Sequence, residues 1–147
     1  MIRTLQPDDH AAWTELWKAY LAFYETMLPQ EVHASTWSRL LDPKEPCWGA
    51  IALQQGQPIG LVQWIYHRTN WSIVDTCYLQ DLFVAPSMRG QGHARQMIEY
   101  VAAAASAQGC SRLYWLTHET NTTAMALYDR VASRSGFIQY RIALPAR

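Results

Sequence analysis

The sequence predicts an α/β fold in which a mixed, mostly antiparallel sheet carries helices on its faces. Two observations support this prediction. Three strand-like runs follow one another between residues 47 and 84, and from residue 94 onward helical and strand-like patterns alternate to the end of the chain. Consecutive strands favour antiparallel pairing, whereas strand–helix alternation favours helices packed against a sheet. Together the two patterns indicate a mixed sheet.

Length and composition narrow the classes of protein. The 147 residues suit one domain, which we expect to span residues 1–147. Half of the residues are apolar and the net charge is zero. This excludes a disordered chain and argues against a nucleic-acid binder, because no excess of cations is present to neutralise phosphates.

The first part of the chain predicts a short strand and two helices. Residues 2–5 are strand-like, and Asp8 is placed to cap a helix whose apolar residues recur every three or four positions: Trp13, Leu16, Trp17, Tyr20, Leu21 and Tyr24. A second, less regular helical stretch ends before Pro43.

Strand patterns fill the middle of the chain. Residues 47–53 and 58–66 form the expected arms of a hairpin with Gly56 in its turn, and residues 74–84 form a third strand that stops before Pro86. A helix from Ala94 to Gly109 follows, then a strand at 111–117, a helix at 124–131 and a closing strand at 137–144.

The three cysteines, Cys47, Cys77 and Cys110, form no CxxC pair and have no histidine at metal-ligand spacing. We therefore expect free thiols and no metal. The first residues lack a secretory pattern, and no apolar run approaches the ~20 residues that span a bilayer. These features predict a cytoplasmic protein without a membrane partner.

A turn with two glycines, Gly90 and Gly92, connects the third strand to a helix. Without Cβ atoms, successive backbone N–H groups can surround a phosphate at the positive end of the helix dipole, with Arg89 and Arg95 nearby. The alternative is a glycine-rich loop that only caps the helix. Neither a P-loop nor a Rossmann fingerprint fits, because the Lys-Ser/Thr ending and the third spaced glycine are both missing.

The segment Arg89-Gly-Gln-Gly-His-Ala94, preceded by Leu-Phe-Val and Pro86, resembles the glycine turn of the GNAT superfamily of acetyl-coenzyme A dependent N-acetyltransferases. A second stretch with Asn121 and Tyr128 agrees in order and spacing, and the element order resembles this superfamily over essentially the whole chain. The sequence of residues 67–84 resembles that of the branch that contains histone, polyamine and spermidine/spermine acetyltransferases. The resemblance implies a sheet splayed between its fourth and fifth strands.

The resemblance also implies residues for acetyl-coenzyme A. Backbone groups of a strand would pair with the pantetheine arm at Leu82, Phe83 and Val84. Backbone amides of the turn would hold the pyrophosphate at Arg89, Gly90, Gln91, Gly92, His93 and Ala94. Asn121 would reach the cofactor arm, although an N-cap role is equally natural for that residue.

For catalysis the resemblance assigns Tyr128 as the acid that protonates the departing thiolate. The alternative is a core tyrosine on the apolar side of its helix. Gln80 stands where the polyamine branch often has a glutamate, so the base is sought among Asp81, His67, His118 and Glu119. Asp81 is the preferred candidate, with a structural acceptor role as the alternative, and strand alternation places Gln80 and Asp81 on opposite faces.

The acceptor pocket is expected from acidic and aromatic side chains of the first strands and helices, which suit a cationic amine. Its predicted residues are Glu25, Trp37, Trp64 and Gln80. The predicted function is acetylation of a primary amine on a small or polyamine-like molecule. The alternatives are a protein lysine or N-terminal acetyltransferase and a non-catalytic acyl-coenzyme A binding domain. A homodimer is expected from the branch resemblance.

Overall fold

The computed structural model describes residues 1–146. The chain forms two compact units, Met1–Leu116 and Thr117–Arg147. The described part of the first unit holds the sheet and the helices that cover it, and that of the second holds one further helix. The expectation of a single domain over residues 1–147 stays a prediction.

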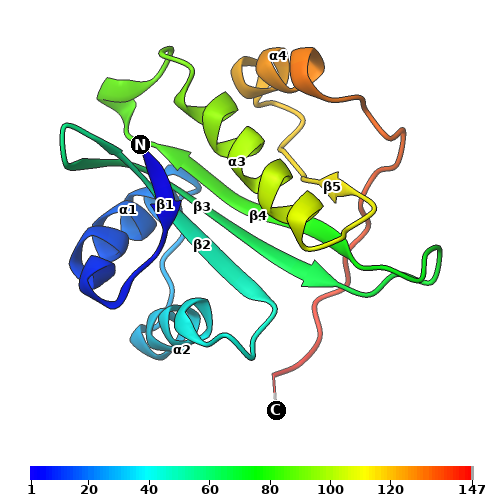
Figure 1. Cartoon of the computed structure of the whole chain (residues 1–147), viewed down its shortest axis with the longest axis horizontal. Helices are drawn as coiled ribbons and strands as arrows, with labels where there is room; N and C mark the ends of the chain where they lie inside the picture. Colours follow the sequence, from blue (N-terminus) through cyan, green and yellow to red (C-terminus); the bar gives the residue numbers. More distant parts are fainter. Residues whose placement is uncertain (147) are drawn as a thin grey trace. The chain divides into compact units, whose positions relative to one another are not determined.

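The first unit is built on a sheet with the strand order β1-β2-β3-β4-β5 (Figure 1). The first four strands pair antiparallel, and β4 and β5 pair parallel. The mixed, mostly antiparallel sheet is therefore confirmed. The strands are β1 (Ile2–Thr4), β2 (Cys47–Gln54), β3 (Gln57–His67), β4 (Thr76–Val84) and β5 (Leu113–Tyr114).

The hairpin between β2 and β3 forms as the glycine in its turn predicted. Gln55 and Gly56 connect the strands with φ angles of 50° and 76°. Two positive φ values in a two-residue loop match the right-handed twist of the flanking strands. The turn thereby sets the register that pairs Gln54 with Gln57.

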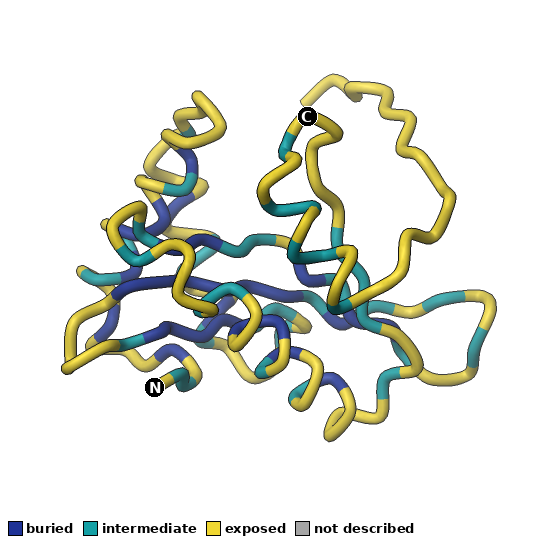
Figure 2. The backbone as a smooth tube through the Cα atoms, turned by 90° about the horizontal axis from the view of Figure 1, so that it is seen from above, coloured by how far each residue is buried: buried dark blue, intermediate teal, exposed yellow. Residues whose placement is uncertain are grey.

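Helices cover both faces of this sheet. α1 (His10–Phe23) packs its buried tryptophans and leucines against Ile51, Leu61 and Phe83, and α2 (Gln30–Leu41) packs against β2. α3 (His93–Ala107) lies over β3 and β4 and buries Met97, Ile98, Val101 and Ala105. The buried stretches of the strands run between these layers (Figure 2).

The start of α1 differs from the prediction by one residue. The N-cap is Asp9 and not Asp8, because a 3-10 turn, η1 (Pro7–Asp9), precedes the helix. The Asp9 carboxylate accepts hydrogen bonds from the Gln6 backbone N–H and from Arg3. It thus ties the start of α1 to β1.

The second unit contains α4 (Thr122–Val131) and an irregular segment after it. The predicted closing strand at 137–144 is wrong, since residues 132–146 contain no strand and are exposed (Figure 2). Alternating apolar residues favour a strand, but a strand forms only where a neighbouring backbone pairs with it. None does within residues 1–146. Nor does any helix in that range have the length and apolarity to cross a membrane.

Candidate functional site

The strands β4 and β5 separate after a short contact. They pair only at Cys77 with Leu113 and at Tyr78 with Tyr114. Within residues 1–146 the rest of β4 has a ladder partner on the β3 side alone. The predicted splay between the fourth and fifth strands is therefore present. The backbone groups that residues 79–84 turn toward this opening are available to an extended ligand.

The glycine turn ends at the N-terminus of α3. Gly90 and Gly92 have φ angles of 76° and 85°, and Gly92 is the N-cap, which supplies no side-chain hydrogen bond. A Cβ atom added at either glycine would meet no other atom within 4 Å. The first N–H groups of a helix lack intrahelical partners. The turn therefore presents uncapped donors beside open space, which suits a phosphate group.

The two arginines of this segment are held away from the turn by other partners. The Arg89 Nε atom donates to the Val84 carbonyl oxygen at 3.0 Å, and its guanidinium lies over the rings of Phe23 and Phe83. Arg95 forms an exposed ion pair with Glu99 at 2.8 Å. The backbone of the turn, more than these cations, makes the anion site.

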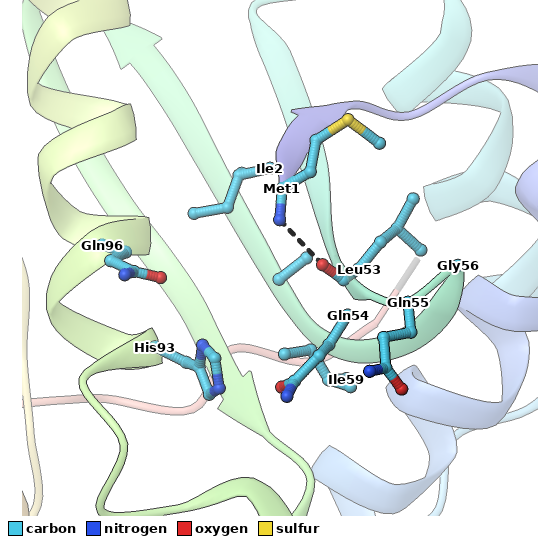
Figure 3. A pocket seen from close by; sticks show the side chains of 10 residues that line it. Met1, Ile2, Leu53, Gln54, Gln55, Gly56, Ile59, His93 and Gln96 are labelled. Carbon is cyan, nitrogen blue, oxygen red and sulfur yellow. Dashed lines mark hydrogen bonds between the residues drawn. The ribbon is translucent and has the colours of Figure 1, made fainter.

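The His93 side chain points into a neighbouring cavity of about 400 Å³ (Figure 3). The cavity lies between the β2–β3 hairpin, the first strand and the first turn of α3. The Nε2 atom of His93 is buried and has no hydrogen-bond partner among residues 1–146. Only the backbone N–H of His93 is therefore placed for the predicted phosphate contact.

On the opposite face of the sheet, Asp81 is the end of a buried hydrogen-bond chain. The Trp13 Nε1–H donates to the Gln63 Oε1 atom at 2.7 Å, and the Gln63 Nε2–H donates to the Asp81 Oδ2 atom at 2.9 Å. The hydroxyl of Tyr20 on α1 also lowers the pKa of Asp81. Burial raises the pKa of Asp81, and the hydrogen bonds from Gln63 and Tyr20 partly offset this.

Tyrosines surround this carboxylate. Desolvation raises the pKa values of Tyr20, Tyr24 and Tyr78, and the charge of Asp81 adds to the rise in each of them. Among residues 1–146 no Lys, Arg or His forms an ion pair with Asp81. The site thus holds one carboxylate among neutral phenols, which favours a cationic ligand.

A β-bulge lies beside Asp81. Gln63 pairs with Asp81, and the next residue of β3, Trp64, pairs with Leu79, so that Gln80 is one extra residue in β4. Simple alternation does not apply across a bulge, so the argument that put Gln80 and Asp81 on opposite faces does not hold. Gln80 is exposed there, while Leu79 is buried.

His67 is held by two hydrogen bonds. Its Nδ1 atom lies 2.8 Å from the Arg68 carbonyl oxygen and its Nε2 atom 2.7 Å from the Tyr114 hydroxyl. A carbonyl only accepts, so Nδ1 carries a proton, and in the neutral ring Nε2 then accepts from Tyr114. The Tyr114 ring stacks on Tyr78 at 4.9 Å, which places His67 at the β5 end of the tyrosine cluster.

The predicted acceptor residues do not form one cluster. Glu25 lines a cavity of about 570 Å³ between α1 and α2, and Trp37 packs against Trp13 with a ring separation of 5.1 Å. Trp64 is 2% exposed and contacts Tyr100 of α3 on the other face of the sheet. This burial argues against Trp64 as an acceptor contact, and Gln80 alone of the four lies next to Asp81 in the chain.

Comparison with known proteins shows the family. The model of the acetyltransferase (GNAT) family matches residues 10–132. The D-amino-acid N-acetyltransferase HPA3 of Saccharomyces cerevisiae is 34% identical over 143 residues, covering 96% of this chain and 89% of the relative. The chain belongs to the GNAT acetyltransferase family.

Two further proteins agree with this assignment. A thialysine N-epsilon-acetyltransferase of Caenorhabditis elegans is 30% identical over 130 residues, covering 88% of this chain and 80% of the relative. The structure of AAC(6')-Iy in complex with a bisubstrate analogue, CoA-S-monomethyl-acetylneamine, has a TM-score of 0.78 at 22% identity and covers 100% of this chain and 96% of that chain. The latter similarity concerns the fold alone.

The second unit of this acetyltransferase carries the two remaining predicted residues. The Asn121 Oδ1 atom accepts a hydrogen bond from the Ala124 backbone N–H at 3.4 Å, so Asn121 caps α4. This supports the N-cap alternative and leaves a contact with the cofactor as a prediction. Tyr128 lies half-buried on α4. Its catalytic role stays a prediction.

The other candidate bases of the acetyltransferase, His118 and Glu119, are exposed residues of the second unit. His118 is engaged locally, since its Nδ1 atom lies 2.7 Å from the Thr120 hydroxyl. The sequence patterns did not indicate Gln63 as the partner of Asp81 or Trp13 as the partner of Gln63. A signal was present, because Gln63 interrupts an apolar strand and is 4% exposed in the structure.

Proposed function

We propose that this acetyltransferase transfers the acetyl group of acetyl-coenzyme A to a primary amine of a small cationic molecule. One observation supports this acceptor class above the others. Asp81 is a half-buried carboxylate whose partners, Gln63 and Tyr20, are neutral. A carboxylate that is partly removed from water without a counter-ion is destabilised, and an alkylammonium group would supply the missing positive charge.

Backbone groups form the proposed site for the acetyl donor, acetyl-coenzyme A. The open turn at Gly90 and Gly92 fits a pyrophosphate, since no atom lies where their Cβ atoms would be. Amides from Arg89 to Ala94 would hold that group, and the strand segment Leu82, Phe83 and Val84 would lie along the pantetheine arm. Acetyl-coenzyme A supplies the activated thioester. Backbone groups alternate along a strand, and the Ala85 N–H donates to the Ile59 carbonyl on β3, so Leu82 and Val84 turn theirs toward the opening while Phe83 pairs with β3. Because Arg89 already occupies the Val84 carbonyl oxygen, Leu82 is the freer contact.

Two proton transfers remain for the chain. An ammonium group must lose a proton before its nitrogen can attack, and Asp81 is the proposed acceptor of that proton. A departing thiolate is stabilised by a proton, and Tyr128 is the proposed donor. The neighbouring phenols of Tyr20 and Tyr78 remain neutral, because their pKa values are raised.

The relatives support a small acceptor. One is named for D-amino acids and another for thialysine. The alternatives from the sequence, a protein lysine or N-terminal acetyltransferase and a non-catalytic acyl-coenzyme A binding domain, remain outcomes of the test. The first predicts turnover of peptides only, and the second predicts binding without turnover.

The test is an acceptor screen that follows release of the coenzyme A thiol. It compares spermidine, lysine, thialysine, D-amino acids, aminoglycosides and lysine peptides. Turnover restricted to neutral or anionic amines would exclude the proposed acceptor class. Gly92→Glu should abolish acetyl-coenzyme A binding in calorimetry, because it adds bulk and a like charge beside the phosphates.

The chain offers a matched control for that variant. Gly109 follows the other end of α3, has the same φ angle of 85°, and also has open space where a Cβ would be. Gly109→Glu therefore carries the same backbone strain far from the turn. Equal loss of binding in both variants would mean that strain, and not the phosphate site, is responsible.

We further propose a homodimer in the cytoplasm. The exposed apolar residues of the segment after α4 support self-association, since they offer a surface for a second copy: Phe137, Ile138, Tyr140, Ile142 and Leu144. Light scattering after size exclusion tests the dimer, and a monomeric mass at micromolar concentration would exclude it. Fractionation of the native cell tests the compartment.

A further inference from the structure

The hydrogen-bond chain behind Asp81 has a fixed direction. An indole Nε1–H is a donor and cannot accept, so Trp13 requires an acceptor from Gln63. The Gln63 Oε1 atom meets this need at 2.7 Å. Its amide nitrogen must then face the other way, toward the Asp81 Oδ2 atom at 2.9 Å. Trp13 therefore decides which end of Gln63 meets the carboxylate.

Packing holds this chain in one arrangement. Trp13 is 1% exposed and Gln63 is 4% exposed. The Trp13 ring stacks on Trp17 at 6.0 Å and contacts Trp37 at 5.1 Å. A flipped Gln63 amide would point its nitrogen at the indole N–H and leave two buried donors facing each other. That arrangement costs an unmade hydrogen bond at both atoms.

We propose that Gln63, oriented by Trp13, is a positioning residue that holds Asp81 as a proton acceptor for the substrate ammonium group. This inference rests on the proposed function and extends it to two residues that would not touch the substrate. Gln63 occupies one lone pair of Oδ2 as a donor. The remaining carboxylate lone pairs stay available to Tyr20 and to the amine.

The proton balance agrees with this role. The transfer breaks an N–H bond of the ammonium and forms an O–H bond on Asp81, which gives a neutral amine and a neutral carboxylic acid. The proton cannot enter on the lone pair that faces the Gln63 Nε2–H, because two hydrogens would then meet. Gln63 thereby directs the proton to the side of the carboxylate that it does not cover.

The titratable groups around Asp81 do not compete in this step. They are Tyr20 and Tyr24 from α1 and Tyr78 from β4, and the pKa of each is raised above its ordinary value. All three remain neutral in the range where a carboxylate titrates. A change in that range can therefore be assigned to Asp81.

The experiment compares Trp13→Phe and Gln63→Leu with the wild type. Removing the donor to Asp81 favours its protonated form, so the acid limb of the kcat/KM profile should move to higher pH. For Gln63→Leu we expect a shift of about 1 to 2 pH units, the range for a lost hydrogen bond to a charged group. Trp13→Phe should shift the limb in the same direction by less, because Gln63 is kept.

Trp17→Phe is the matched control. Trp17 is the neighbouring tryptophan of α1, is 6% exposed, and its Nε1 atom has no hydrogen-bond partner among residues 1–146. Its replacement removes an indole that packs on Trp13 and Tyr20 but leaves every hydrogen bond of the chain, so the acid limb should move less than in Trp13→Phe. A shift as large as that of Trp13→Phe would overturn the inference, because loss of packing would then explain both.

A second readout does not require activity. The carboxyl carbon of Asp81, followed by ¹³C NMR in the protein alone, should titrate at higher pH in Gln63→Leu and Trp13→Phe than in the wild type. An unchanged titration would overturn the positioning role. If the wild type acetylates no amine in the screen while this titration shifts as expected, the proposed function fails and the arrangement of the chain stands.

Discussion

The face of the sheet turned toward α1 and the face turned toward α3 are made by the same strands but differ in polarity. Neighbouring residues of β3 show the contrast, since Gln63 joins the hydrogen bonds of Trp13 and Asp81 while Trp64 contacts Tyr100 of α3. On the α3 side Cys77 and Met97 are fully buried. The α1 face therefore buries a hydrogen-bonded polar chain within its apolar core, whereas the side chains named on the α3 face make apolar contacts.

This difference separates chemistry from stability. Polar groups are expensive to remove from water unless each one is paired, so a half-buried carboxylate with neutral partners is a candidate for a functional role. Apolar packing on the α3 face needs no such explanation. Substitutions on the α1 face should consequently change the reaction, and those on the α3 face should change the free energy of unfolding.

The largest expected effect is on the α1 face. Asp81→Asn keeps the shape of the side chain and removes the proton acceptor. We expect kcat to fall by roughly 100- to 10,000-fold, the usual range for a positioned acid or base, with the circular dichroism spectrum retained. Steady-state kinetics with the best acceptor of the screen measure it. A kcat near that of the wild type would assign Asp81 a structural role only.

Tyr128→Phe tests whether the acid comes from Tyr128, a residue of the second unit. We expect kcat to fall by roughly 100- to 10,000-fold while acetyl-coenzyme A affinity changes little, because one hydroxyl contributes little to ground-state binding. Tyr140→Phe is the control, as Tyr140 belongs to the same unit and is 89% exposed. Full activity in Tyr128→Phe would leave the thiolate to be protonated by solvent.

The strands and turns that form the two faces could be predicted from local sequence patterns. Runs of apolar, aromatic and β-branched residues predicted the strands of the sheet, and Gly56 and Gly92 marked two turns that require positive φ angles. The splay was expected from the family resemblance. Each of these features depends on residues that are close together in the chain, where sequence patterns carry most of their information.

The parts that could not be predicted depend on distant pairing. Trp13 and Gln63 lie 50 positions apart, and no local pattern shows that they meet. The bulge at Gln80 is a property of β4 against β3, so alternation along β4 alone does not determine the face on which Gln80 lies. Residues 137–144 alternate like a strand, but pairing with another backbone decides whether one forms.

On the α3 face, Met97→Ala should cost stability and leave the chemistry alone. Met97 is fully buried, and its side chain lies within about 3 Å of the position that a Cβ of Gly60 would take. Truncation leaves a cavity, for which we expect about 2–5 kcal/mol of lost unfolding free energy. Urea denaturation measures the loss. If kcat fell with it at temperatures where the variant is folded, the two faces would not be independent.

The pH dependence of the free energy of unfolding tests the α1 face through a smaller effect, whose direction follows from the raised pKa of Asp81. Burial raises the pKa of Asp81 in the folded state above its unfolded value of about 3.8. The folded state therefore holds this proton to higher pH, so the wild type loses stability relative to Asp81→Asn as pH rises from the unfolded pKa through the folded one. Above that window the difference should be constant. Parallel curves from pH 3 upward would contradict the raised pKa.

The smallest expected effect concerns the link between the glycine turn and the α1 face. Arg89 reaches from the turn to the Val84 carbonyl oxygen and lies 5.3 Å and 5.7 Å from the ring centres of Phe23 and Phe83. An exposed cation–π contact contributes about 0.5–1 kcal/mol. Arg89→Ala should lower stability by about that amount and raise KM for acetyl-coenzyme A less than about tenfold, since the carbonyl and the turn both lose a restraint.

The control for Arg89→Ala is Arg95→Ala, which removes a surface pair with Glu99 on the same helix. Such i,i+4 pairs contribute about 0.3–0.5 kcal/mol and do not restrain the turn. Its KM for acetyl-coenzyme A should therefore stay close to that of the wild type at physiological salt. If Arg95→Ala raised KM as much as Arg89→Ala, the two arginines would act through their charge on the phosphates. The contact between Arg89 and Phe83 would then make no contribution to cofactor binding. The site for acetyl-coenzyme A would depend on α3 and its glycine turn alone.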